Sequence, residues 1–96
     1  MFIVLLKYIK PLSEVDRFVA EHRDFLARHY ASGNFLLSGR QEPRTGGVIL
    51  ATAATRADVE RIIENDPFHR ERIADYEIVE FLPSMSAKSL AGLIAS

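Results

Sequence analysis

The chain has 96 residues, which is enough for one domain, residues 1–96, but leaves surface that a partner chain could help to bury. Its 12 basic and 13 acidic residues are spread along the sequence and give a net charge of −1, so we expect neither nucleic acid nor a membrane as a partner. The absence of cysteine excludes disulfides, thiolate metal sites and cysteine nucleophiles. No signal-like or 18-residue apolar run is present, which predicts a soluble, cytoplasmic protein.

The first third of the chain predicts a strand followed by a helix. Residues 2–9 are apolar on both alternating faces, as in a strand buried on two sides. Pro11 ends this strand, and Ser13 with Asp16 resembles a capping box at the start of a helix. Gly33 and Asn34 supply a left-handed stop. The helix carries one apolar stripe at spacings of three and four residues, made of Val15, Phe18, Val19, His22, Phe25, Leu26 and Tyr30.

The rest of the chain predicts a hairpin, a second helix and a last strand. Residues 35–40 and 46–52 are expected to be strands joined by a polar loop. Thr55 is expected to cap a helix over residues 56–65. Residues 76–82 alternate as a strand, and residues 84–96 form a weak amphipathic helix.

The order β-α-β-β-α-β is that of a ferredoxin-like α+β fold, in which two helices cover one face of a four-stranded antiparallel sheet. The first and third strands are apolar on both faces, so the face without helices also needs a cover. The short C-terminal helix is too small for this. The pattern therefore favours a homodimer in which two sheets pack together as a dimeric α+β barrel.

Asp66 stands at the end of the second predicted helix, immediately before Pro67. A carboxylate there faces the negative end of the helix dipole, and the proline prevents the helix from continuing. One interpretation is an Asp-Pro turn in which the side chain bonds to nearby backbone amides and Phe68 enters the core. The alternative is that Asp66 faces a partner elsewhere in the chain, and His22 is the candidate.

His22 occupies a position in the apolar stripe where Leu or Phe would be expected. A core histidine bonded to a backbone carbonyl is the simpler interpretation, and an acid–base group paired with Asp66 is the other. A dipole contact explains His29 near the helix end, and His69 is expected to be exposed. No HxH or HxxxH spacing occurs, so we expect no metal and no cofactor.

Ser38 and Gly39 come late in the second strand. A glycine there either lets a ligand approach the backbone or marks a β-bulge. Arg40 and Arg44 could meet an anionic ligand at the mouth of a site, or could be surface charges.

Three segments together resemble the YCII-related (YciI-like) family: residues 21–26 around His22, residues 33–39, and Asp66-Pro67-Phe68 followed by residues 75–81. The resemblance covers nearly the whole chain and depends on the order and spacing of these segments. It implies a ferredoxin-like dimeric barrel and a His-Asp active site at His22 and Asp66. Two positions depart from the family pattern, because Arg72 stands where relatives commonly have glycine and Val19 stands where they often have arginine.

The residues and the resemblance together predict a small-molecule enzyme in which Asp66 orients His22 as a general acid or base. The expected chemistry is cofactor-free: a lyase reaction such as dehydrochlorination, or an isomerisation, of a small cyclic or aromatic substrate. The predicted pocket is formed by Tyr8, Phe68, Ser38 and Gly39. Two alternatives stay open: a non-catalytic metabolite-binding or regulatory dimer, and a cofactor-independent monooxygenase-like barrel.

Overall fold

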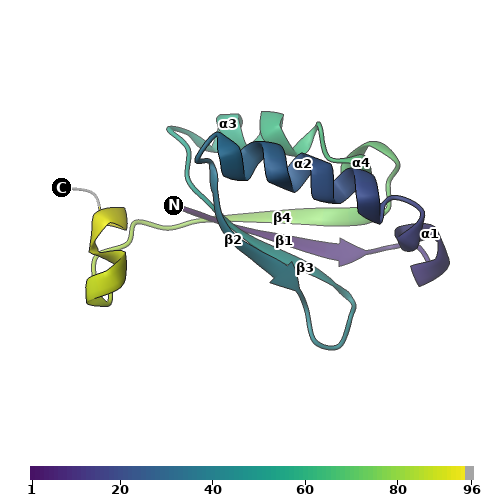
Figure 1. The fold of residues 1–96 in the computed structure, drawn as a ribbon, viewed down its shortest axis with the longest axis horizontal. Helices are drawn as coiled ribbons and strands as arrows, with labels where there is room; N and C mark the ends of the chain where they lie inside the picture. Colours follow the sequence, from purple (N-terminus) through teal and green to yellow (C-terminus); the bar gives the residue numbers. More distant parts are fainter. Residues whose placement is uncertain (95–96) are drawn as a thin grey trace.

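The computed structural model describes residues 1–94 and contains the expected βαββαβ order, with additional short helices (Figure 1). Two helical segments lie between the first two strands, and two lie between the third and fourth. The elements are β1 Phe2–Tyr8, α1 Leu12–Asp16, α2 Val19–Ala31, β2 Phe35–Arg40, β3 Gly46–Ala51, α3 Arg56–Ile63, α4 Pro67–Arg70, β4 Ala74–Glu80 and the 3₁₀ helix η1 Lys88–Leu93.

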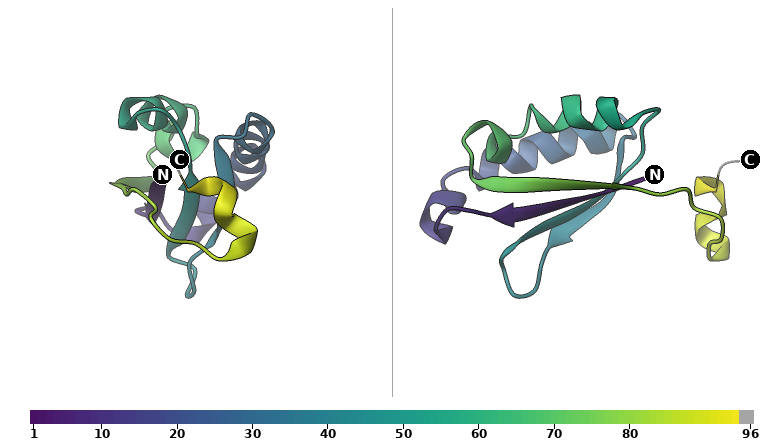
Figure 2. Two further views of the ribbon diagram at one scale, coloured as in Figure 1. Left: turned by 90° about the vertical axis from the view of Figure 1, so that its left-hand side faces the viewer. Right: turned by 180° about the vertical axis from the view of Figure 1, so that it is seen from behind.

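The four strands form one antiparallel sheet in the order β2-β3-β1-β4. Helices α2 and α3 lie on the same face of this sheet, and within residues 1–94 no helix covers the opposite face (Figure 2). This topology confirms the ferredoxin-like α+β fold. It arises because alternate residues of each strand point to opposite faces, so one set can be buried under the helices.

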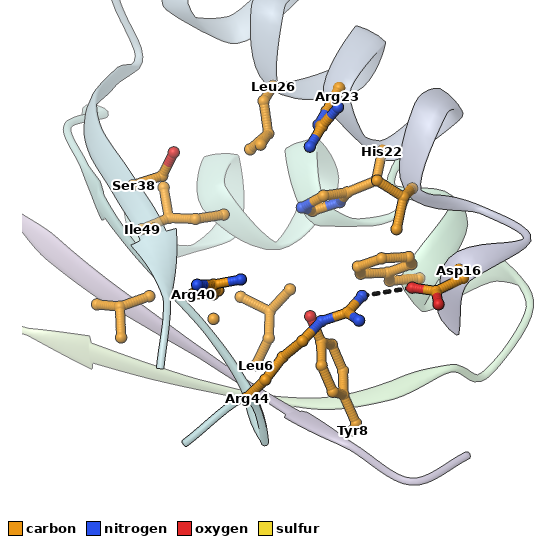
Figure 3. A pocket seen from close by; sticks show the side chains of 15 residues that line it. Leu6, Tyr8, Asp16, His22, Arg23, Leu26, Ser38, Arg40, Arg44 and Ile49 are labelled. Atoms are coloured by element: carbon orange, nitrogen blue, oxygen red, sulfur yellow. Dashed lines mark hydrogen bonds and ion pairs between the residues drawn. The ribbon is translucent and has the colours of Figure 1, made fainter. Parts of the chain in front are cut away.

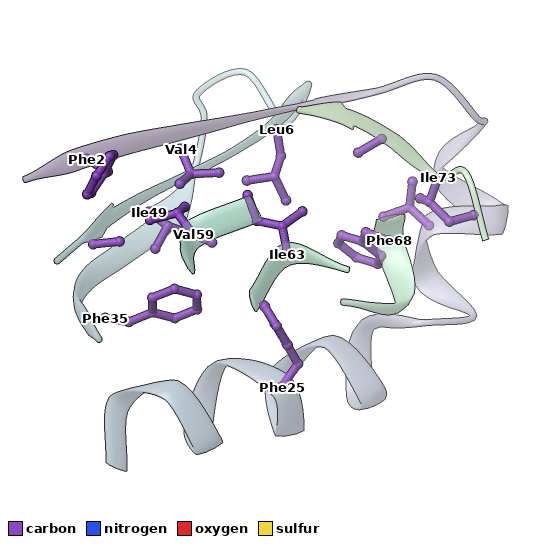
Figure 4. Packing of buried hydrophobic residues seen from close by; sticks show 13 residues of the cluster. Phe2, Val4, Leu6, Phe25, Phe35, Ile49, Val59, Ile63, Phe68 and Ile73 are labelled. Carbon is purple, nitrogen blue, oxygen red and sulfur yellow. The ribbon is translucent and has the colours of Figure 1, made fainter. Parts of the chain in front are cut away.

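The core lies between the sheet and the helices (Figure 4). Phe2, Val4 and Leu6 of β1 point toward the helices and are at most 2% exposed. Phe25 of α2 and Phe68 of α4 meet them from the other side. Burial of each such side chain contributes about 1.5–3 kcal/mol, so this face holds the fold together.

The first predicted helix is wrong in detail, because the structure divides it into α1 and α2. Phe18 between them has φ −115° and ψ 5°. The backbone amides of Arg17 and Phe18 donate to the carbonyl three residues earlier, instead of four as in an α-helix. The predicted capping box is also wrong. The cap residue is Pro11, and no side chain bonds to the open end of α1, since Ser13 already lies inside the helix. Gly33 has φ +85° and ends α2 as predicted.

The second half of the chain follows the prediction more closely. Thr55 forms a complete capping box with Asp58 at the start of α3. Strand β4 begins and ends two residues earlier than predicted. The predicted C-terminal helix is reduced to the 3₁₀ helix η1, which projects away from the sheet (Figure 1). Residues 95–96 of the predicted helix lie outside the described residues.

No helix among residues 1–94 is both long and apolar enough to cross a membrane. The cytoplasmic location expected from the sequence stays a prediction.

Arg72 has a left-handed backbone with φ 55°, a conformation that glycine adopts without the steric cost that a side chain brings. Replacing Arg72 with Gly is therefore expected to stabilise the protein by about 0.5–1 kcal/mol, measured as an increased urea midpoint. The neighbouring Glu71 has φ −94°, so Glu71→Gly serves as the control and is expected to lower the midpoint. A lower midpoint for Arg72→Gly would contradict this explanation.

Candidate active site

His22 and Asp66 are hydrogen-bonded to each other. Nδ1 of His22 lies 2.8 Å from Oδ1 of Asp66, across 44 residues of sequence. The Asp66 carboxylate is completely buried, whereas the side chain of His22 is 15% exposed to solvent. The structure therefore brings together the two residues that the sequence suggested as partners, and the imidazole is the more accessible of the two.

The helix-dipole argument about Asp66 was wrong, whereas the interpretation as a turn that bonds a nearby backbone amide, with Phe68 in the core, is confirmed. Asp66 follows α3, but it is also the N-cap of α4, and its side chain accepts a hydrogen bond from the backbone N–H of Phe68 at 3.0 Å. Pro67 occupies the first position of α4, where its missing N–H does no harm. A carboxylate at a helix N-terminus is favourable, so Asp66 is stabilised locally as well as by His22.

Tyr76 is a third member of this hydrogen-bonded group, and the sequence analysis missed it. Its hydroxyl donates to Oδ2 of Asp66. Burial, together with the neighbouring Asp66 carboxylate, raises the pKa of Tyr76, so its hydroxyl remains protonated and available as a donor. The available signal was a tyrosine on the inward face of the last strand, since a buried tyrosine hydroxyl usually needs a partner.

The hydrogen bonds to Asp66 determine which nitrogen of His22 is free. An ionised carboxylate only accepts hydrogen bonds, so Nδ1 of His22 carries a hydrogen and donates it to Asp66. In the neutral imidazole, Nε2 then has a lone pair that can accept a proton. This arrangement gives the ring the properties of a general base.

Aromatic contacts hold the His22 ring in place. Its ring is stacked on Phe68, with the ring centroids 4.1 Å apart and the planes 8° apart. Tyr8 meets the ring of Phe68 edge-on at 5.9 Å. Phe68 thus packs against one face of the imidazole, while the hydrogen bond to Asp66 fixes the rotation of the His22 ring.

The His22 ring borders a pocket of about 670 Å³, which lies between α2 and the side of the sheet formed by β2 and β3 (Figure 3). Tyr8, Ser38, Gly39 and Phe68, the four predicted substrate-binding residues, all line it. Asp66 does not line the pocket and lies behind His22. The other lining residues are Leu6, Asp16, Val19, Arg23, Leu26, Arg40, Arg44, Gly47, Val48 and Ile49.

The β-bulge interpretation of Gly39 is wrong, whereas the close approach of a ligand to its backbone stays a prediction. A Cβ added at Gly39 would meet no atom within 4 Å, so the protein's own packing does not require glycine. The β-bulge expected as an alternative lies earlier in β2, between Phe35 and Leu37. Ser38 points to the helix-covered face, where its hydroxyl is hydrogen-bonded to that of Tyr30.

The two other histidines lie outside the pocket. The ring of His29 packs against Phe25 and Phe35, and burial lowers the pKa of His29. His69 is exposed and meets the ring of Tyr76 edge-on. Among residues 1–94, no group of three potential metal ligands lies close enough together to hold an ion.

The fold and the site together define a ferredoxin-like α+β domain with a histidine–carboxylate pair beside a pocket. A family model for the YCII-related domain matches residues 1–82, and the chain belongs to this family. The resemblance noted from the sequence is thereby confirmed.

A solved structure has the same fold. It is 5-chloro-2-hydroxyhydroquinone dehydrochlorinase (TftG) from Burkholderia phenoliruptrix AC1100, in a complex with 2,5-dihydroxybenzoquinone. The two chains are 18% identical and superpose with a TM-score of 0.66, over 84% of this chain and 93% of the other. No curated protein sequence matches the chain.

Proposed function

We propose that this protein is a small-molecule enzyme in which His22 acts as a general acid or base without a cofactor. The observation that carries the proposal is the His22–Asp66 hydrogen bond at the edge of a pocket, with the accessible imidazole toward the pocket and the buried carboxylate behind it. The substrate is a small cyclic or aromatic molecule, and the reaction is an elimination or an isomerisation.

The proposed chemistry uses one proton and one electron pair. Nε2 of His22 removes a proton from the substrate, and the negative Asp66 carboxylate stabilises the imidazolium that forms. In an elimination, the electron pair left on the substrate forms a double bond and expels a leaving group such as chloride. In an isomerisation, the imidazolium returns the proton to another atom of the same molecule.

Membership of the YCII-related family supports an enzyme of this type. The solved relative is named as a dehydrochlorinase of a chlorinated ring and was observed with a quinone. At 18% identity, this similarity supports only the shared fold. The substrate of the present chain must therefore be inferred from the residues of its own pocket.

A ligand screen tests the proposal. We expect ligand-detected NMR with phenols, quinols, lactones and haloaromatics to identify a compound that binds and is converted. His22→Ala is expected to lower kcat at least about 100-fold, because it removes the general base. His69→Ala is the control, since His69 lies outside the pocket and should not affect turnover. A compound that binds but is never converted, with affinity unaffected by His22→Ala, would favour a non-catalytic binding module.

The homodimer belongs to the same proposal. The uncovered face of the sheet carries Ile3 and Leu5 of β1, Leu50 of β3 and Leu37 of β2, and Leu37 is 68% exposed. Apolar residues on adjacent strands form a surface that a second sheet can cover. A face-to-face dimer would bury these side chains and leave the helices outside.

Light scattering at micromolar concentration is expected to give about twice the chain mass of 10.8 kDa. Leu50→Glu is expected to shift the protein toward the monomer, because it places a charge within the apolar face. Ala57→Glu on the exposed side of α3 is the matched control and should leave the mass unchanged. A wild-type monomer would rule out the dimer.

A further inference from the structure

Three arginines from different elements line the pocket beside His22. Arg23 lies on α2, Arg40 ends β2, and Arg44 belongs to the loop before β3. Figure 3 shows their side chains extending into the space that the His22 ring borders. Asp16 supplies the one carboxylate among the lining residues that the structure describes. The lining therefore carries an excess of positive charge, although the whole chain has a net charge of −1.

The existing ion pairs neutralise these arginines incompletely. Arg44 lies 2.5 Å from Asp16, and this hydrogen bond raises the pKa of Arg44. Arg40 pairs with Glu42 at 3.0 Å, but both side chains are more than two-thirds exposed, so solvent makes this pair weak. Within residues 1–94, Arg23 forms no ion pair. Its guanidinium keeps its hydrogen-bond donors for a ligand.

Apolar side chains form the rest of the pocket surface near His22. Leu6 comes from β1, Leu26 from α2 and Ile49 from β3. An apolar surface bordered by a few directed polar groups is typical of a small-molecule site, in which the apolar part binds the ring and the polar groups set its orientation.

We infer that the pocket binds a ring compound carrying an anionic oxygen substituent, and that Arg23, with Arg40 and Arg44, holds that substituent while the ring faces His22. The shared chemistry is that of a carboxylate or an ionised ring hydroxyl. This inference rests on the proposed function for the role of His22 and adds the charge class of its substrate. The planar guanidinium groups suit paired oxygen atoms.

Benzoate and benzamide form a matched pair of probes, because they share a ring and differ in charge. Titrated into the ¹⁵N-labelled protein, benzoate is expected to shift the amide signals of His22 and Arg23 and to bind roughly tenfold more tightly than benzamide. Added sodium chloride should weaken benzoate binding more than benzamide binding. Equal affinities, shifts located elsewhere, or no binding of either compound at millimolar concentration would overturn the inference.

Single arginine variants test where the anion binds. Arg23→Gln is expected to weaken benzoate about tenfold and to leave benzamide unchanged, because glutamine retains donors but loses the charge. Arg56→Gln is the control, since Arg56 lies on α3 outside this pocket and pairs with Glu60. If none of Arg23→Gln, Arg40→Gln and Arg44→Gln reduces the preference for benzoate, the inference is wrong.

The inference and the proposed function can fail separately. His22→Ala should keep the preference for benzoate, because the arginines and not the imidazole hold the charge. A strong anion preference in a protein that converts no compound would support the inference and remove the catalytic proposal. Conversely, His22-dependent conversion of an uncharged ring, without a preference for benzoate, would retain the catalytic proposal and overturn the inference.

Discussion

Replacing Asp66 with Asn is expected to lower kcat by about 100- to 1,000-fold while changing KM only a few-fold. The variant removes the negative charge that stabilises the His22 imidazolium. This imidazolium forms only after His22 has taken a proton from the bound substrate, so the loss affects kcat more than KM. The effect should be large because the carboxylate is completely buried and water cannot replace it. The measurement uses the substrate found in the ligand screen.

The Asp66→Asn variant should still fold. The amide oxygen of asparagine can accept the hydrogen bonds from His22 and Phe68, and asparagine is a favourable N-cap residue. Its NH₂ group can donate to the hydroxyl of Tyr76, which then acts as acceptor. Thermal unfolding checks this point. Asp24→Asn makes the same change of charge on the exposed side of α2 and should leave kcat unchanged. If Asp66→Asn keeps the wild-type kcat, the carboxylate has no part in catalysis.

The fold could be predicted from the sequence because it depends on patterns that recur along the chain. Alternating apolar residues marked the strands, and Thr55 and Gly33 marked helix ends whose geometry is local. The break at Phe18 could not be predicted, because the apolar spacing continues through it without interruption. Pattern alone also could not show that Asp66 begins a new helical turn after α3, since α4 is only four residues long.

The site could be predicted in part for a similar reason. His22 stood out in the apolar stripe of its helix and Asp66 at the end of the predicted second helix, which suggested that they are partners, although Asp66 is favourably placed as the N-cap of α4. Tyr76 and Arg23 are ordinary residues in their own elements. Tyr76 reaches the site because β4 lies next to Asp66, and Arg23 reaches it because α2 lies next to the β2–β3 hairpin. Such contacts depend on tertiary structure, which spacing along one element does not report.

Gly46→Ala is expected to destabilise the protein by about 3–5 kcal/mol, which is enough to unfold a domain of this size or nearly so. Gly46 pairs with Lys7 where β3 meets β1. A Cβ at this position would lie 1.7 Å from the carbonyl oxygen of Leu6 and 2.8 Å from its carbonyl carbon. Both are backbone atoms of β1, one of the two central strands, so relief requires β1 and β3 to separate at this end of their ladder.

The neighbouring glycines make a graded control series. A Cβ at Gly47 would lie 3.3 Å from the carbonyl oxygen of Gly39, and a Cβ at Gly39 would meet nothing within 4 Å. Urea denaturation at one protein concentration should therefore rank stability as Gly39→Ala above Gly47→Ala above Gly46→Ala, with Gly39→Ala within about 0.5 kcal/mol of the wild type. Because Leu6 and Gly47 also line the pocket, any folded Gly46→Ala protein should bind benzoate more weakly. A Gly46→Ala variant as stable as Gly39→Ala would show that β1 and β3 do not approach each other as closely as this register requires.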